Sequence, residues 1–242
     1  MSSRRALIWA VAIAWLLEHV VPFGRLLMYP FTLLATWVHE TGHGVAALAT
    51  GGHFDKLEIF GDASGLAHTR EVGNVAVAIT CLGGMLAPPL VGAVLLAFAR
   101  GPRRARIALF VLAALLVVTL ALWVRSTAGF VVVPLCAALI GWAAWSWEPA
   151  KRLVLTQFIA ITLALDTVGR MVGYALATKA TVGGSERTSD VAAVADALGG
   201  HHLLWGALVI TVALALLGAG LWAAWRPSRS GPTPGRARAA RR

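Results

Sequence analysis

Residues 29–50 read YPFTLLATWVHETGHGVAALAT, an apolar run whose centre carries His39, Glu40 and His43. A transmembrane helix needs about 20 mostly apolar residues, and this run has that length. His39 and His43 are four residues apart, so on a helix they share one face. Charged and imidazole side chains at membrane depth are energetically costly and mark functional sites. The stretch therefore predicts a membrane-embedded helix that carries a polar site.

The composition of the whole chain agrees with this prediction. The 242 residues are 58% hydrophobic and 13% charged, with a mean hydropathy of +0.75, whereas a soluble domain carries about 25% charged residues. Such a chain cannot cover a water-facing surface. We therefore expect an all-α membrane protein, a single polytopic bundle of about six to seven transmembrane helices over residues 1–226. The apolar runs lie at about 6–24, 29–50, 73–99, 107–124, 129–147, 153–177 and 202–225.

The charge of the chain is strongly basic, with a formal net charge of +10. The basic residues flank the apolar runs, so the expected partner is the lipid bilayer and not nucleic acid. The tail 227–242 is rich in Pro, Gly, Ser and Arg, and we expect it to be disordered. Arg4 and Arg5 place the first segment's start in the cytoplasm, and the basic tail places the last segment's end there too. Seven complete spans cannot satisfy both signals, so one segment does not cross fully or one signal misleads.

Two connections are longer than turns. Residues 51–72 contain the alternating stretch Lys56-Leu57-Glu58-Ile59 and then Gly61-Asp62-Ala63-Ser64-Gly65. Alternation followed by turn residues predicts a short β-hairpin directly after the His39–His43 helix. Residues 178–201 are polar and mostly without pattern, although 190–198 is compatible with a short helix capped by Ser189 or Asp190.

The stretch His39-Glu40-Thr41-Gly42-His43 has the HExxH spacing. Two imidazoles on one helix face can bind one Zn²⁺, and Glu40 can act as general base toward a water on that metal. Random placement gives the pattern with an expectation of roughly 0.005 in a chain of this composition. The alternative is that these side chains only satisfy one another by hydrogen bonds. The spacing predicts His39 and His43 as zinc ligands and Glu40 as the catalytic base.

Catalytic zinc usually has three protein ligands, so a third must come from elsewhere. Asp166 is the only acidic residue deep inside an apolar segment besides Glu18 and Glu40, which makes it the candidate. The alternative is a salt bridge between Asp166 and Arg170, four residues later. Weaker candidates lie in connections that we expect to face water: His53, Asp62, His68, His201 and His202.

The motif and its surroundings resemble the site-2 protease family of intramembrane zinc metalloproteases, in its compact M50B-like bacterial branch without a PDZ domain. The HExxH helix continues as GVAALATGG over 44–52, and CLGGMLAPP over 81–89 looks like the family's small-residue helix. The resemblance covers about residues 29–225. It implies a metallopeptidase-like core, a β-hairpin after the motif helix and an aspartate ligand on a later helix, similar to Asp166.

The leading hypothesis is an intramembrane zinc metalloendopeptidase in a bacterial plasma membrane that cleaves membrane-protein or peptide substrates. In it, His39, His43 and Asp166 hold Zn²⁺, and Glu40 deprotonates the zinc-bound water. A second hypothesis is a non-proteolytic membrane protein whose zinc site serves structure or partner binding. A third is a transporter, which would need two related halves, and the sequence has no such repeat. The oligomeric state is not readable from the sequence.

Overall fold

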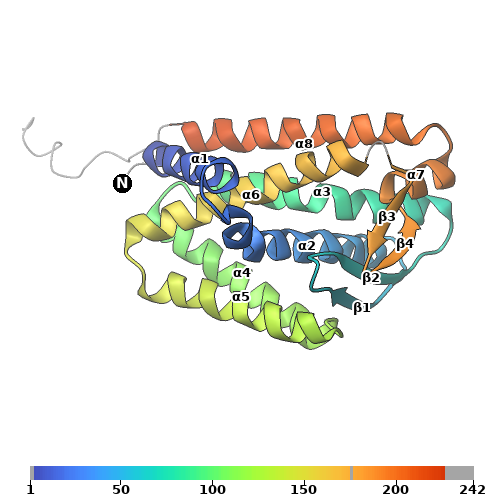
Figure 1. The fold of residues 1–242 in the computed structure, drawn as a ribbon, viewed down its shortest axis with the longest axis horizontal. Helices are drawn as coiled ribbons and strands as arrows, with labels where there is room; N and C mark the ends of the chain where they lie inside the picture. The colour runs from blue at the N-terminus through green and yellow to red at the C-terminus, as the bar shows by residue number, and fades with distance from the viewer. Residues whose placement is uncertain (1–2, 175–176, 227–242) are drawn as a thin grey trace, which may run out of the picture.

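The computed structural model describes residues 3–174 and 177–226, without the side chains of Ser3, Glu18, His19, Arg25 and residues 167–174. Seven long helices, one short helix and two β-hairpins make up these residues (Figure 1). The expected mostly helical membrane fold is confirmed, whereas the tail 227–242 lies outside the described residues. The elements are α1 (Ser3–His19), α2 (Gly24–Ala49), β1 (His53–Ile59), β2 (Gly65–Arg70), α3 (Asn74–Phe98), α4 (Pro102–Leu122), α5 (Thr127–Ser146), α6 (Pro149–Tyr174), β3 (Lys179–Val182), β4 (Ser185–Thr188), α7 (Asp190–Leu198) and α8 (His202–Trp225).

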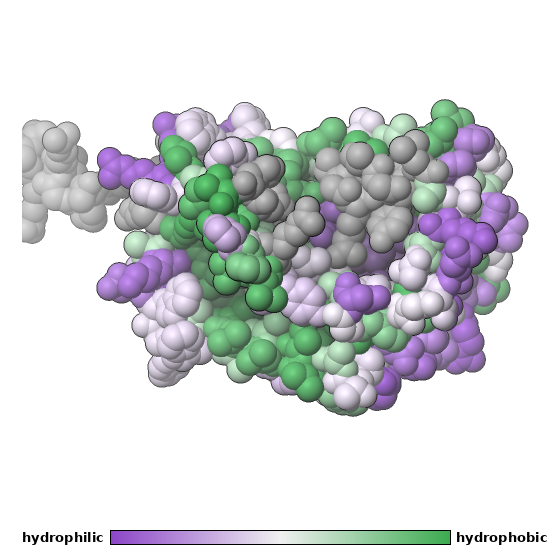
Figure 2. Space-filling view, in the orientation of Figure 1, coloured by the Kyte–Doolittle hydropathy of each residue, from purple (hydrophilic) through white to green (hydrophobic). Residues whose placement is uncertain are grey.

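Four of the described helices are long and apolar enough to cross a membrane by length and composition, namely α3, α4, α5 and α8. These four match predicted apolar runs, and α2 and α6 fill two further runs with more polar sequences. In Figure 2 hydrophilic residues gather at the two ends of the molecule, and much hydrophobic surface lies between them. The chain is therefore an integral membrane protein by fold and composition.

The two ends of the bundle have different contents. One end holds the starts of α1, α4 and α6 and the ends of α3, α5 and α8, and we call it the arginine end (Figure 1). There Ala6, Ala99, Ala105 and Leu153 form one buried cluster. The opposite end holds both β-hairpins, residues 123–126 and α7, and we call it the hairpin end (Figure 1).

The helices α1 and α2 together make one passage between these ends. Ala6 of α1 belongs to the arginine-end cluster, whereas α2 leads directly into β1 at the hairpin end. The helices α3, α4, α5, α6 and α8 each make one further passage, so the described chain crosses the bundle six times. The conflict between the two charge signals is thereby removed, because Arg4 and Arg226 lie at the same end.

Small residues let α2 and α3 approach closely. A Cβ atom on Gly42 would lie 2.6 Å from the Gly83 carbonyl oxygen, and one on Gly83 would overlap the side chain of Ala46. Glycine at such positions allows close packing of membrane helices. The contact fixes the face of α2 that carries His43 against α3.

The expected hairpin after the motif helix is present as β1 and β2, with Leu57 opposite Ala67. Two side chains of α2 hold its turn: the Tyr29 hydroxyl donates to the Gly61 carbonyl at 2.6 Å, and the Thr36 hydroxyl donates to the Ala63 carbonyl at 2.7 Å. Residues 29 and 36 are two helical turns apart and therefore share a face. The hairpin is thus docked along one side of the motif helix.

The outer edge of β1 is covered by the connection between α4 and α5. The Leu57 amide donates to the Trp123 carbonyl at 2.8 Å, and the Arg125 amide donates to the Leu57 carbonyl at 2.9 Å. The Ser126 hydroxyl donates to the Ile59 carbonyl at 2.9 Å. This two-stranded sheet has two edges. The connection covers the β1 edge, and the other edge belongs to β2.

The second hairpin, β3 and β4, was not expected from its polar sequence. Its turn is Gly183-Gly184 with φ of 55° and 79°, and Val182 faces Ser185 across it. Two residues with positive φ form the tight turn that suits a twisted hairpin, and glycine adopts it without strain. The Gly183 amide also donates to the Ser64 hydroxyl at 3.0 Å, so the two hairpin turns touch.

Candidate metal centre

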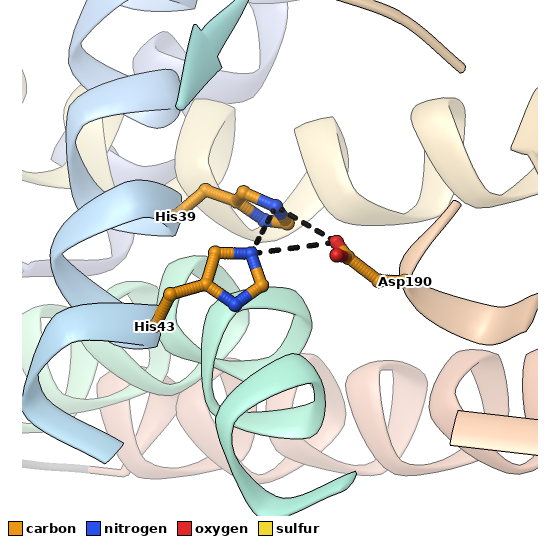
Figure 3. A group of neighbouring side chains, drawn as sticks. All are labelled: His39, His43 and Asp190. Carbon is orange, nitrogen blue, oxygen red and sulfur yellow. Dashed lines mark hydrogen bonds and ion pairs between the residues drawn. The ribbon is translucent and has the colours of Figure 1, made fainter. Parts of the chain in front are cut away.

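The two histidines of α2 meet an aspartate from α7 (Figure 3). His39 Nε2 lies 3.1 Å from Asp190 Oδ2 and 3.1 Å from His43 Nε2, and His43 Nε2 lies 3.4 Å from Asp190 Oδ2. Both imidazoles and the carboxylate point toward one another (Figure 3). The ligand atoms of these three side chains all lie within 4.8 Å of one another, so among the described residues they form a group that could hold a metal ion.

The orientation of His43 is set by α3. Its Nδ1 atom lies 2.9 Å from the Thr80 carbonyl oxygen. A carbonyl only accepts, so Nδ1 carries the proton and Nε2 presents its lone pair to the centre. Gly84 gives the ring its room, because a Cβ atom there would overlap His43. A backbone carbonyl that fixes the tautomer in this way is a common support of metal-ligating histidines.

Asp190 is positioned by the start of α7. The Ser189 side chain accepts from the Ala192 amide and caps the helix, so the Asp190 carboxylate does not serve as the cap. Burial by itself would raise the pKa of the Asp190 carboxyl, but His43 and His39 outweigh it and hold the pKa below its usual range. The group is therefore a carboxylate at neutral pH, as a metal ligand must be.

The three ligand atoms fit a zinc ion. Zinc–nitrogen and zinc–oxygen bonds of about 2.0–2.2 Å in a tetrahedron put neighbouring ligand atoms about 3.3–3.6 Å apart. The three distances of 3.1, 3.1 and 3.4 Å are close to the edges of one face of that tetrahedron. Two imidazoles and a carboxylate are also ligand types that zinc accepts, and three protein ligands leave a fourth position open.

Glu40 lies beside this group on α2 and is buried, with 6% of its surface exposed. Its Oε2 atom accepts a hydrogen bond of 2.7 Å from the Ala67 amide on the outer edge of β2. A Cβ atom on Gly65 would lie 2.6 Å from Glu40 Cγ, so the glycine lets the strand approach the carboxylate. The hairpin therefore fixes the direction of the Glu40 side chain.

A cavity of about 280 Å³ joins these groups. His39, Glu40, His43 and Asp190 all line it. Its walls also include residues of β2, β3 and β4, among them Gly65, Ala67, Thr181, Val182 and Thr188. The two hairpins thus enclose the space in front of the candidate metal centre.

Asp166, the third ligand predicted from the sequence, lines the same cavity from α6. It is not a member of the close group formed by His39, His43 and Asp190. The Arg170 side chain, its predicted alternative partner, lies outside the described residues. Asp166 as a zinc ligand therefore stays a prediction.

Asp190 received no such role from sequence reasoning, because it stands in a polar connection and not in an apolar run. The sequence signal at this position was a helix start, and the structure has that helix with Ser189 as its cap. The weaker candidates have other contacts: His68 Nε2 lies 2.6 Å from Glu58, Asp62 accepts from Ser64, and His201 caps α8.

The fold and the centre together define a helical membrane protein with a His-His-Asp group beside a buried glutamate. A family model described as Peptidase M50B-like matches residues 6–220, and the chain belongs to this family. The resemblance to site-2 proteases is thereby confirmed. Searches among curated proteins and among solved structures found no match.

Proposed function

We propose that this chain is an intramembrane zinc metalloendopeptidase whose metal ligands are His39, His43 and Asp190. The observation that carries the proposal is that these three side chains and Glu40 line a single cavity. Membership of a peptidase family supports the same conclusion. The expected substrates are membrane proteins or peptides, and the expected location is a bacterial plasma membrane.

When bound, zinc would supply Lewis acidity that polarises a peptide carbonyl and acidifies water. Glu40 is the residue that would move the protons. It takes a proton from the attacking water and delivers it to the leaving amide nitrogen as the C–N bond breaks. The hydrogen bond from the Ala67 amide holds the Glu40 carboxylate in the cavity before and after this transfer.

The outer edge of β2 is a suitable place for the substrate backbone. A transmembrane helix satisfies its own hydrogen bonds, so a segment of it must unwind before a peptide bond can be cleaved. An extended segment can then pair with an exposed strand edge. Gly65 and Ala67 of β2 border the cavity that also contains Glu40, which brings such a segment next to the proposed base.

The alternative is a membrane protein that uses zinc for structure or partner binding. Such a site has no need for a base or an open cavity, whereas here Glu40 lines the cavity with the three proposed ligands. Metal content cannot separate the two functions because both bind zinc. Proteolytic turnover can.

The test is a Glu40→Gln variant assayed against a candidate membrane substrate. We expect zinc content to stay near that of the wild type and cleavage to fall by at least about 100-fold, because a positioned general base contributes about 10²–10⁴ to the rate. Glu148→Gln is the matched control, since Glu148 is exposed near the arginine end and far along the chain from the cavity. Undiminished cleavage by Glu40→Gln would remove Glu40 from the mechanism.

A further inference from the structure

The charges of the described residues are divided unequally between the two ends of the bundle. The arginine end has nine basic residues, with Glu148 as its acidic residue: Arg4, Arg5, Arg100, Arg103, Arg104, Arg106, Lys151, Arg152 and Arg226. Their common location is fixed by contacts between distant segments. The Arg4 side chain donates to the Trp225 carbonyl at 2.9 Å, and the Arg100 side chain donates to the Arg226 carbonyl at 2.6 Å.

The hairpin end has more acidic than basic residues. Its five basic residues are Lys56, Arg70, Arg125, Lys179 and Arg187, and its seven acidic residues are Asp55, Glu58, Asp62, Glu71, Glu186, Asp190 and Asp196. Several of the basic residues are paired locally. Arg70 binds Asp55 at 2.7 Å, Lys56 binds Glu58 at 3.0 Å and Lys179 binds Glu186 at 2.9 Å. This end therefore offers little net positive charge to a membrane surface.

Tryptophans mark the lipid interface at the arginine end. Arg4 lies over the ring of Trp225 at 5.3 Å, Arg106 over Trp145 at 5.7 Å, and Arg226 over Trp222 at 3.4 Å. These three tryptophans are exposed. Tryptophan concentrates at the membrane–water interface, and arginine beside it reaches the headgroups. The arginine end thus has the composition of a surface that contacts anionic headgroups.

We propose that the arginine end faces the cytoplasm and that the cavity with His39, His43 and Asp190 opens toward the extracytoplasmic face. Basic residues in short connections are retained on the cytoplasmic side, where the leaflet is anionic. The short connections 99–101 and 147–148, together with the first residues of α4 and α6 that follow them, carry six of the nine basic residues. The six passages place the segments around Arg4 and Arg226 on this same side, so all the basic signals agree.

The consequence of this orientation for substrates rests on the proposed function, and it makes that function more specific. The substrate segment reaches β2 and Glu40 from the extracytoplasmic face of the membrane. A substrate protein that exposes an unwound segment only in the cytoplasm would meet the arginine end. That end is on the opposite side of the bundle from the cavity. The substrate class is therefore membrane proteins with a cleavable segment at the extracytoplasmic end of their helix.

Cysteine labelling in intact cells tests the orientation. The native cysteines are first removed by Cys81→Ala and Cys136→Ala, and single cysteines are then placed at Gly61 or Ser185 in the hairpin end, or at Gly101 or Glu148 in the arginine end. Gly61 and Gly101 have open space around an added Cβ atom, and Ser185 and Glu148 are exposed. Two positions at each end keep the result readable if one variant folds poorly.

A membrane-impermeant maleimide should label Gly61→Cys and Ser185→Cys in intact cells. Gly101→Cys and Glu148→Cys should react only after the membrane is permeabilised, and this second labelling measures the amount of protein present. Labelling of the arginine-end positions in intact cells, alone or together with the hairpin-end positions, would overturn the proposed orientation. Because labelling needs no activity, a chain with the expected pattern that cleaves nothing refutes the proposed function and leaves the orientation standing.

A charge-neutralised variant tests whether the basic residues of the arginine end determine the orientation. Arg103→Gln, Arg104→Gln and Arg106→Gln together remove three of the nine basic residues of the arginine end, and we expect Gly101→Cys to become several-fold more reactive in intact cells. The control removes basic charge from the hairpin end by Lys56→Gln and Lys179→Gln and should leave the pattern unchanged. If Gly101→Cys is labelled equally in both variants, the basic residues of the arginine end do not determine the orientation.

Discussion

At the scale of residues, the candidate centre depends on a few side chains whose directions are fixed by neighbours. His43 is held by the Thr80 carbonyl, and Glu40 is held by the Ala67 amide. His39 and His43 need only the periodicity of one helix to share a face. Asp190 reaches the centre only through the tertiary fold, because it lies 147 positions after His43 in the sequence.

Zinc-binding measurements can decide whether Asp190 or Asp166 is the third metal ligand. We expect Asp190→Ala to lower zinc affinity by more than about 100-fold, since even the loss of a group that only supports a ligand costs 10–100-fold. Asp166→Ala is the matched variant because Asp166 lines the same cavity. Zinc titration of the purified proteins measures both. A large loss with Asp166→Ala and none with Asp190→Ala would restore the ligand set predicted from the sequence.

A glycine beside the centre gives a second prediction. A methyl group at Gly84 would overlap the His43 ring, so Gly84→Ala should displace Nε2 and reduce zinc affinity by at least about 10-fold. Gly141→Ala is the control, because its added Cβ atom would lie 3.8 Å from the nearest atom, the Cβ of Ala113. If the Gly84 variant binds zinc as tightly as the wild type, the close approach of α3 is not what positions His43.

At the scale of elements, the central interaction is the docking of the first hairpin on α2. Tyr29, Thr36 and Glu40 all contact the segment that connects or forms β1 and β2. The hairpin itself was predictable from alternation and turn residues. Its docking was not, because the partners of these three side chains are backbone atoms that no sequence pattern identifies.

Thr36→Val tests this docking. The substitution keeps the shape but leaves the Ala63 carbonyl without its donor, so the free energy of unfolding should fall by about 1–3 kcal/mol. Thermal or chemical unfolding in detergent gives the measurement. Thr162→Val should change stability much less, because the Thr162 hydroxyl donates to the carbonyl of Ile159 within its own helix. Equal effects of the two variants would mean that the hairpin is held mainly by packing.

At the scale of the whole molecule, the metal centre joins the start of α7 to the middle of the bundle. Segment 177–201 contains both β3–β4 and α7, and its contacts to α2 include Asp190 with His39 and His43. A bound ion would add coordinate bonds between α2 and α7. Ligand binding to the folded state stabilises the elements that it connects.

Metal removal should therefore loosen α7 more than the rest of the molecule. We expect chelation to speed amide hydrogen exchange in α7 and at the turn Gly183-Gly184, because local opening no longer has to break metal–ligand bonds. The helices α4 and α5 pack on each other and contribute no residue to the lining of the cavity, so they serve as the internal control. Uniform acceleration in all helices would indicate global unfolding and not a local link.

The sequence by itself determined the membrane class, the apolar helices, the first hairpin and the pair of histidines with Glu40. These features follow from composition and from short-range periodicity, which act within one segment. It did not determine that α1 and α2 share one passage, that Gly183-Gly184 closes a second hairpin, or that Asp190 meets His39 and His43. Those features depend on contacts between residues far apart in the chain, and only the tertiary structure brings such residues together.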